Sequence, residues 1–355
     1  MNSTFYSNST ELAEDEYPVN ASVAGEGQWT KTHCSLGRDN FISVLVLISY
    51  ITIFIVGLIG NSTVVGRTCL LRCRSSVDMY IVNLAIANLL FISTLPFWIL
   101  NTLQNRWPFG SVMCKLCSFA SSLNMYSSVF FITCLSIDRY LAIAYPGTSL
   151  KMQRISRVLV SSCLIWVTAC AVSLPNIFLH QSSFSKERNT TVCTVVYPRH
   201  HTAQWTMAID LGENMVGFVI PFLLLGVIYL LIYRALNHTL KPETSKQGRM
   251  LETASALLLA FLICWLPFQT VTFLRELVKF QMITDCRLVS VIEAALPVTV
   301  CVAYSHSCIN PILSWFCGGY FKNRSRKPSL PPTSIYMRPT TVFEQEKSGE
   351  RPAEP

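Results

Sequence analysis

The sequence predicts an all-α membrane protein, built as a bundle of seven transmembrane helices. Of its 355 residues, 51% are hydrophobic and only 14% are charged, whereas a soluble domain carries about 25% charged residues. The uncharged stretches are long enough to supply the roughly 20 helical residues that cross a hydrocarbon core. The sequence shows no ten-residue alternating pattern of the kind that forms a membrane barrel, so helices remain the way to satisfy the backbone in lipid.

Seven uncharged runs define the helices in order along the chain. The runs cover residues 41–66, 79–104, 116–137, 158–185, 214–233, 253–274 and 294–320. The spans that we expect around them are 41–67, 77–104, 111–145, 155–180, 205–236, 249–278 and 288–317. We expect residues 1–40 to form an outer tail and residues 318–355 to form a short, mostly disordered cytoplasmic tail.

The distribution of charge orients the bundle. Residues 1–40 hold six acidic and two basic residues. Basic residues gather instead in alternate connections and at the start of the last tail. They are Arg67, Arg72, Arg74, Arg139, Lys151, Arg154, Arg157, Lys322, Arg324, Arg326 and Lys327. Because cytoplasmic loops are enriched in Lys and Arg, the N-terminus is expected outside the cell. The net charge of +8 therefore reflects membrane topology and not a nucleic-acid-binding surface, and we expect a multi-pass protein of the cell membrane.

The outer segments carry candidate modification sites. Glycosylation sequons occur at Asn2, Asn8 and Asn20 in the outer tail and at Asn189 in an outer loop. The first forty residues lack the apolar core of a cleavable signal peptide, so we expect the first span to direct its own insertion.

Four of the fourteen cysteines lie on the expected outer side, namely Cys34, Cys114, Cys193 and Cys286. Disulfides persist in that oxidising compartment. Four cysteines allow three pairings, and spacing does not choose among them. Most of the other cysteines lie within the spans, where they are expected to be small buried apolar residues.

Short motifs recur on the spans in a fixed order. They are Gly60-Asn61, Asn83-Leu84-Ala85, Asp138-Arg139-Tyr140, Trp166, Pro221, Tyr229, Cys264-Trp265-Leu266-Pro267 and Asn310-Pro311. Prolines within helices remove backbone hydrogen bonds and provide hinges. Arg139, at the inner end of its helix, can pair with Asp138 in one state and release to a partner protein in another. Taken together, the motifs resemble those of rhodopsin-like receptors.

Within that class, the chain is similar to the angiotensin and bradykinin group of peptide receptors, from about Cys34 to Phe321. Matching stretches include residues 107–110, 123–126, 214–221 and 284–287, and residues 295–297 and 303–304 lean toward angiotensin receptors. The resemblance implies a peptide ligand outside and a heterotrimeric G protein inside, with receptor kinases and arrestin acting on the tail. It also implies the disulfides Cys114–Cys193 and Cys34–Cys286.

The resemblance implies functional residues at both ends of the bundle. For G-protein coupling these are Asp138, Arg139, Tyr140 and Tyr229. For the ligand they are Trp98, Tyr126, His180, Glu213, Trp265, Gln269, Arg275, Glu293 and Tyr304. The resemblance implies no catalytic residue, metal ligand or cofactor.

Several of these positions depart from the angiotensin receptor pattern, in which Glu213 corresponds to a lysine, His180 to an arginine and Arg275 to an aspartate. The first two cations take the carboxylate end of the peptide in that family, so angiotensin II is not expected to bind tightly here. A ligand with a basic or amidated end suits this charge pattern better. Two other roles for Glu213 remain open: pairing with Arg275 or His180, or protonation beside Asp210.

A second set of departures concerns signalling. Asn88 stands where family members place an aspartate that helps to bind sodium, and Ser314 replaces a tyrosine of the seventh span. Cys317 is either a lipidation site or a buried thiol. These changes raise the alternative of a weakly coupling, arrestin-biased or decoy receptor, although the intact Asp138-Arg139-Tyr140 favours signalling.

Other classes lack support in the sequence. No lysine occurs between Lys279 and Lys322, so the seventh span cannot form the Schiff base of a light sensor. Internal repeats of the transporter kind are not evident. No histidine accompanies Ser136 and Asp138 as a hydrolase would require, so we do not expect an enzyme.

Overall fold

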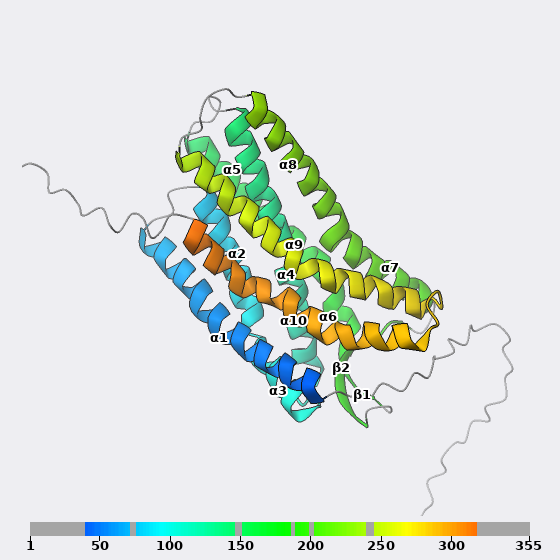
Figure 1. Cartoon of the computed structure of the whole chain (residues 1–355). Helices are drawn as coiled ribbons and strands as arrows, with labels where there is room; N and C mark the ends of the chain where they lie inside the picture. Colours follow the sequence, from blue (N-terminus) through cyan, green and yellow to red (C-terminus); the bar gives the residue numbers. More distant parts are fainter. Residues whose placement is uncertain are drawn as a thin grey trace, which may run out of the picture.

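The computed structural model describes residues 40–71, 76–145, 151–185, 189–198, 202–238 and 245–317. Within this part of the chain, seven helical segments are long and apolar enough to cross a membrane. They are Asn40–Thr68, Ser76–Gln104, Gly110–Ala144, Ser156–Leu179, Gln204–Leu236, Leu251–Lys279 and Cys286–Ser314. The predicted bundle of seven helices is therefore confirmed (Figure 1).

The elements follow one another in the order that the sequence predicts, with breaks inside three spans. The helices are α1 Asn40–Leu71, α2 Ser76–Ile92, α3 Leu95–Gln104, α4 Gly110–Ala144, α5 Lys151–Ser173, α6 Pro175–Leu179, α7 Thr202–Asn214, α8 Ile220–His238, α9 Ser245–Lys279 and α10 Cys286–Cys317. A π-helical turn, η1 (Met215–Val219), joins α7 to α8. Two strands, β1 (His180–Ser185) and β2 (Thr190–Val195), lie between α6 and α7.

Proline accounts for the position of each break. The second span is interrupted at Ser93 and Thr94, directly before the turn that contains Pro96. The fourth is interrupted at Leu174, before Pro175, and the fifth contains η1 just before Pro221. A proline has no backbone N–H and its ring crowds the preceding turn, so a regular α-helix cannot continue through it unchanged. The second, fourth and fifth spans are thus segmented, where the sequence predicts continuous helices.

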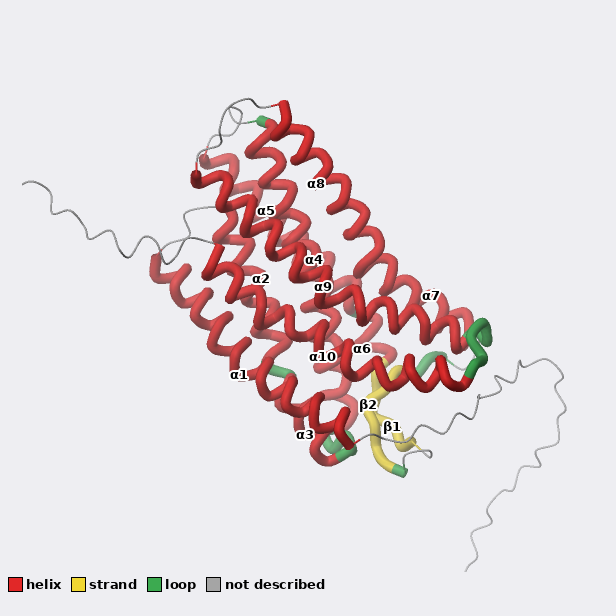
Figure 2. Tube along the Cα trace, viewed as in Figure 1, coloured by secondary structure: helices red, strands yellow, loops and turns green. Residues whose placement is uncertain are grey.

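The two strands are a feature that the sequence analysis missed. They form an antiparallel hairpin, with His180 opposite Val195 and Ser185 opposite Thr190. Figure 2 shows the hairpin at the end of the bundle where α1 begins. His180, predicted as the last residue of the fourth span, begins β1 instead. The hairpin therefore covers the outer end of an otherwise helical molecule.

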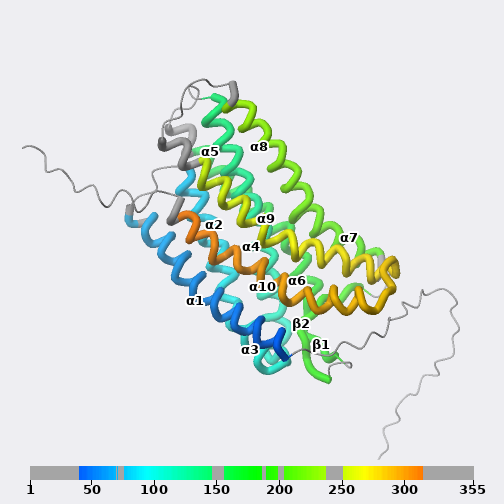
Figure 3. Tube along the Cα trace, viewed as in Figure 1, coloured from blue at the N-terminus to red at the C-terminus, as the bar shows by residue number. Residues whose placement is uncertain are grey.

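The interior is packed around α4. Helix α1 lies beside α2 and α10, and α10 lies beside α9 (Figure 3). The main apolar cluster contains Tyr126 of α4 together with Phe261 and Trp265 of α9. Many large apolar side chains face outward instead, such as Val167 and Ile263, each with 68% of its surface exposed. Such exposure fits helices that contact lipid.

One close helix contact depends on the absence of a side chain. A Cβ atom placed on Gly60 of α1 would lie 2.8 Å from Cγ of Pro311 in α10. The proline ring is fixed to its own backbone, so it has little freedom to move away. Gly66, farther along α1, has open space at the same position, because no heavy atom lies within 4 Å.

We expect Gly60→Ala to destabilise the folded bundle by about 1–3 kcal/mol, the usual cost of overpacking a well-packed site. The melting temperature of the detergent-solubilised protein measures this effect. Gly66→Ala is the matched control, and it should be neutral or stabilising because alanine is the better helix former. Equal melting temperatures for the two variants would contradict the packing that we describe between α1 and α10.

Candidate functional site

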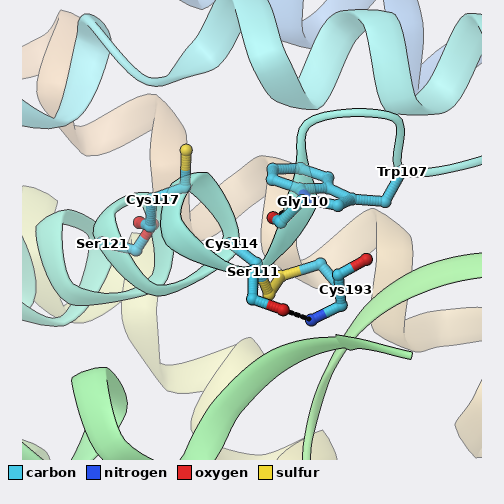
Figure 4. The surroundings of a disulfide bond; sticks show 8 residues. Trp107, Gly110, Ser111, Cys114, Cys117, Ser121 and Cys193 are labelled. Atoms are coloured by element: carbon cyan, nitrogen blue, oxygen red, sulfur yellow. Dashed lines mark hydrogen bonds between the residues drawn. A yellow bond between two sulfur atoms is a disulfide. The ribbon is translucent and has the colours of Figure 1, made fainter.

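A disulfide fixes the hairpin to the outer end of the central helix. Cys114 in the first turns of α4 is bonded to Cys193 of β2, with Cα atoms 5.5 Å apart. Figure 4 shows this disulfide with Ser111 beside it. The backbone N–H of Ser182 in β1 donates to Oγ of Ser111 over 3.2 Å. The Cys114–Cys193 pairing is therefore confirmed. Cys286 is also disulfide-bonded, but Cys34 lies outside the described residues and the Cys34–Cys286 pairing stays a prediction.

Asn189 lies at the turn of the same hairpin. It is exposed, with a positive φ of 50°, a backbone conformation that asparagine tolerates better than most residues. Its side chain is therefore accessible, and glycosylation there stays a prediction. Asn2, Asn8 and Asn20 lie outside the described residues.

Glu213 lies in the last turn of α7, the end of this helix that is farther from the outer face, and a neutral amide holds it there. Its Oε1 atom accepts a hydrogen bond of 2.9 Å from Nδ2 of Asn176 in α6. Among the residues that the structure describes, no Lys, Arg or His forms an ion pair with Glu213. The alternative in which Glu213 pairs with Arg275 or His180 is therefore not observed among the described residues.

Arg275 forms an ion pair with Glu293 and not with Glu213. Its Nε atom donates to Oε1 of Glu293 over 2.8 Å, which joins the outer parts of α9 and α10. Both side chains are one-third exposed, so the pair contributes at most about 1 kcal/mol to stability. Its consequence is mainly geometric, because it pairs two residues, Arg275 and Glu293, that were both predicted to contact the ligand.

Three ionic side chains and a tyrosine form a second group at the outer ends of α7 and α9. Lys279 Nζ donates to Oδ2 of Asp210 over 2.8 Å and to Oε1 of Glu276 over 2.6 Å. The Tyr197 hydroxyl, just after β2, donates to Oδ1 of Asp210 over 2.5 Å. Burial raises the pKa of Tyr197, and the nearby carboxylates raise it further, Asp210 most of all. Tyr197 therefore stays protonated and acts as a donor.

His180 does not supply a compensating positive charge. Burial lowers the pKa of its imidazole, although the Asn176 backbone and the Asp210 charge act in the opposite direction. Since the ordinary pKa is about 6.5, the imidazole is mostly neutral at neutral pH. Among the described residues, the acids of α7 and of the outer part of α9 thus outnumber the cations that pair with them.

The other predicted ligand residues fall into two groups. Tyr126, Trp265 and Gln269 are buried, and Asn214, the neighbour of Glu213, donates to the Gln269 carbonyl over 3.4 Å. By contrast, Trp98 packs on Trp107, and Tyr304 packs between Tyr50 and Phe91. Tyr126 and Trp265 therefore share the main apolar cluster, and Gln269 contacts the residue that follows Glu213, whereas Trp98 and Tyr304 lie among α1, α2, α3 and α10.

At the inner end, Arg139 is buried against α2. It forms an ion pair with Asp138, and its Nη2 atom donates to Oγ of Ser76 over 3.3 Å. The Ser76 hydroxyl in turn donates to Oδ2 of Asp138 over 2.8 Å. Tyr140 is half-buried beside them, and Tyr229 has a buried hydroxyl with no hydrogen-bond partner among the described residues. Arg139 is thus folded into the bundle and is not presented to the cytoplasm in this conformation.

Comparison with known proteins identifies the family to which this bundle belongs. Residues 60–313 match the family model described as "7 transmembrane receptor (rhodopsin family)". The chain belongs to the rhodopsin family of seven-transmembrane receptors. Its members are receptors and not enzymes, and the chain is a multi-pass protein of the cell membrane.

The similar proteins include receptors named for angiotensin II. The chain is 37% identical over 289 residues to the type-1 angiotensin II receptor A of Xenopus laevis, which covers 81% of this chain and 79% of that protein. It is 38% identical over 293 residues to the human type-1 angiotensin II receptor, covering 81% and 80%. The Gallus gallus type-1 receptor is 37% identical over similar coverage. The predicted resemblance to angiotensin receptors is therefore confirmed.

Several polar residues of the outer end were missed by the sequence analysis. Asn176, Tyr197, Glu276 and Lys279 come from three different parts of the chain. The spacing of Glu276 and Lys279, three residues apart at the end of an apolar run, is the one local signal that could have indicated an ion pair. Asn176 and Tyr197 give no such signal, because their partners are distant in sequence.

The core of the receptor holds a network of neutral polar groups. Asn88 Nδ2 donates to Oδ1 of Asn61 over 3.0 Å, and Asn61 Nδ2 donates to the Ser307 carbonyl over 2.8 Å. Asn124 donates to the Ser307 hydroxyl, and His306 contacts the Ser128 hydroxyl at 3.3 Å. A cation in a low-dielectric interior needs an anionic ligand, and this network has none. The residues present therefore do not fit the sodium site that family members have at this position.

We expect Asn88→Asp to make the receptor sensitive to sodium. At a free concentration five times its dissociation constant, an ion bound only to the folded state adds about 1 kcal/mol of stability, or about 2–4 °C in melting temperature. Melting curves in sodium chloride and in choline chloride of equal ionic strength measure the difference. The unaltered receptor should show none, and a sodium-specific stabilisation of it would contradict our reading of the core.

Proposed function

We propose that this receptor binds an extracellular peptide at the outer end of the bundle and activates heterotrimeric G proteins at the inner end. The observation that carries the proposal is the identity of 37–38% to type-1 angiotensin II receptors over four-fifths of the chain. Residues 1–40 act as the glycosylated outer tail, residues 41–317 as the transmembrane domain, and residues 318–355 as the cytoplasmic tail that receptor kinases and arrestin engage.

The ligand differs in charge from angiotensin II. Glu213 and Glu276 place carboxylates at the outer end of the bundle, and His180 is mostly neutral there. These charges favour a peptide that is basic or carries a modified C-terminal end over one that presents a free carboxylate. Trp98, Tyr126, Trp265, Gln269 and Tyr304 are the remaining proposed ligand residues.

Coupling depends on the release of Arg139 from its contacts with Asp138 and Ser76. An agonist has only to favour the conformation in which this arginine is available to the G protein. The prolines in α9 and α10 give the inner ends of these helices hinges about which they can move. The intact ion pair supports a signalling receptor over the alternative of a decoy.

We expect Asp138→Asn to raise the basal rate of nucleotide exchange on the cognate G protein. Removing the carboxylate weakens the ion pair that holds Arg139 inside the bundle. A coupling free energy of about 1–3 kcal/mol corresponds to a change of about 5–150-fold in the active population. Agonist-independent exchange on a panel of purified G proteins measures this effect.

Two further variants complete the test of coupling. Arg139→Ala should abolish exchange, whereas Arg287→Ala, which removes an exposed arginine at the outer end, should leave basal exchange unchanged. A receptor that internalises bound peptides but stimulates no G protein, with or without Asp138→Asn, would replace the signalling function by the decoy function.

A further inference from the structure

The outer ends of α7 and α9 carry more negative charge than the described residues compensate. Asp210 and Glu276 share a single cation, Lys279. Glu213, one turn below Asp210, has a neutral amide as its partner. Arg275 is already paired with Glu293 at 2.8 Å and is not available to them.

One oxygen in this group is both buried and unpartnered. Glu276 is only 4% exposed, and its Oε1 atom is bonded to Lys279. Its Oε2 atom is buried without a hydrogen-bond partner among the described residues. Because a buried polar atom without a partner is destabilising, native structures usually provide one. One acceptor of this carboxylate is therefore left without a donor among the described residues.

The three carboxylates act on a common neighbour, Tyr197. Asp210, Glu213 and Glu276 all raise the pKa of the Tyr197 hydroxyl, which hydrogen-bonds to Asp210. Asp210 thus contacts Tyr197 directly, and Glu213 and Glu276 lie within electrostatic range of the same hydroxyl.

We propose that Asp210, Glu213 and Glu276 form a subsite for a positively charged group of the ligand, the guanidinium or ammonium of a basic residue. The subsite rests on the proposed function as a peptide receptor and specifies which side chains select its ligand. A guanidinium suits this site because it presents several N–H donors in a fixed plane and can bond more than one carboxylate at once.

An inorganic cation is a poorer occupant. Among the described residues, no set of three or more His, Cys, Asp or Glu side chains is placed to hold a metal ion. Lys279 already lies between two of the three acids, so the oxygens that remain are separate acceptors and not a closed shell. They match the spread of donors on an organic cation better than the compact shell of a metal ion.

The test uses a positional-scanning library of short biotinylated peptides, synthesised with either arginine or citrulline at the scanned position. Citrulline has nearly the same shape as arginine but no charge. Binding is measured by flow cytometry on cells that display the full-length receptor with an N-terminal epitope tag, and is corrected for surface expression. We expect the arginine pool to bind at least about tenfold more tightly at one position, as for other buried charge pairs.

The variants locate that preference. Glu213→Gln and Glu276→Gln keep an oxygen that can accept from Asn176 or Lys279, so they remove the charge with little loss of local structure. Each should reduce the ratio of the affinities for the arginine and citrulline pools to near one. Glu213→Lys should reverse the preference, so that the citrulline pool binds more tightly than the arginine pool. Asp285→Asn is the control, since this exposed acid on the same face accepts from the Arg287 N–H, which an asparagine oxygen can also do.

The outcomes separate this subsite from the function on which it rests. Equal binding of both pools at every position, or a preference that survives Glu213→Gln and Glu276→Gln, overturns the subsite but leaves peptide binding intact. A preference lost in these variants without any G-protein activation supports the subsite and overturns coupling. Binding by no pool overturns both. If Glu276→Gln fails to reach the surface, Glu213→Gln carries the comparison.

Discussion

Lipid supplies no hydrogen bonds, and this constraint determines where every polar group of the receptor can lie. Within the spans, hydroxyl side chains bond to carbonyls of their own helix, as Thr52 does to Ile48 and Thr68 does to Val64. Asparagines in the core bond to one another and to the backbone of α10. Because these partners are neutral, the middle of the bundle needs no ion pair. Ionic side chains are left to the two ends, where binding and signalling take place.

The two ends satisfy their charges differently, and the difference suits their roles. At the inner end, Arg139 has an acid beside it and is buried with it, so the resting conformation holds the charge inside. At the outer end, Asp210 and Glu276 share Lys279, and Glu213 has a neutral amide as its partner. In our proposal, a cationic group of the ligand adds an interaction there. A ligand shifts the equilibrium only by its differential affinity for the two conformations. In our proposal, the ligand compensates the acidic charge at the outer end, and activation separates the Arg139–Asp138 ion pair at the inner end.

The sequence alone predicts the seven spans, their order and their family, because apolar length and short motifs are local properties. Local reasoning also finds proline, but it does not show whether a proline kinks, interrupts or widens a helix. Pro96 and Pro175 follow breaks, whereas Pro221 follows a π-helical turn. The β1–β2 hairpin is missed for the same reason, since its strands are half-buried on both faces and lack a clear alternating pattern.

The ligand site is predicted less well than the fold, because its chemistry depends on which side chains meet across helices. The sequence identifies Glu213 and Arg275 as opposite charges at the outer end. It cannot show that Arg275 pairs with Glu293, or that Glu213 accepts a hydrogen bond from Asn176. Lys279, Glu276 and Tyr197 escape notice because each is unremarkable in its own segment. Their role arises only when α7, α9 and the end of β2 come together.

The charge at Glu213 bears on the choice of ligand but not on the fold. Two unit charges about 4 Å apart attract or repel by about 4 kcal/mol at an effective dielectric of 20, before desolvation is subtracted. Even a quarter of that energy changes sign when a lysine becomes a glutamate, and Asp210 and Glu276 add to the negative potential nearby. The packing of Tyr126, Phe261 and Trp265 does not depend on this sign. In our proposal, the same bundle is therefore retained while the charge of the peptide that it selects is reversed.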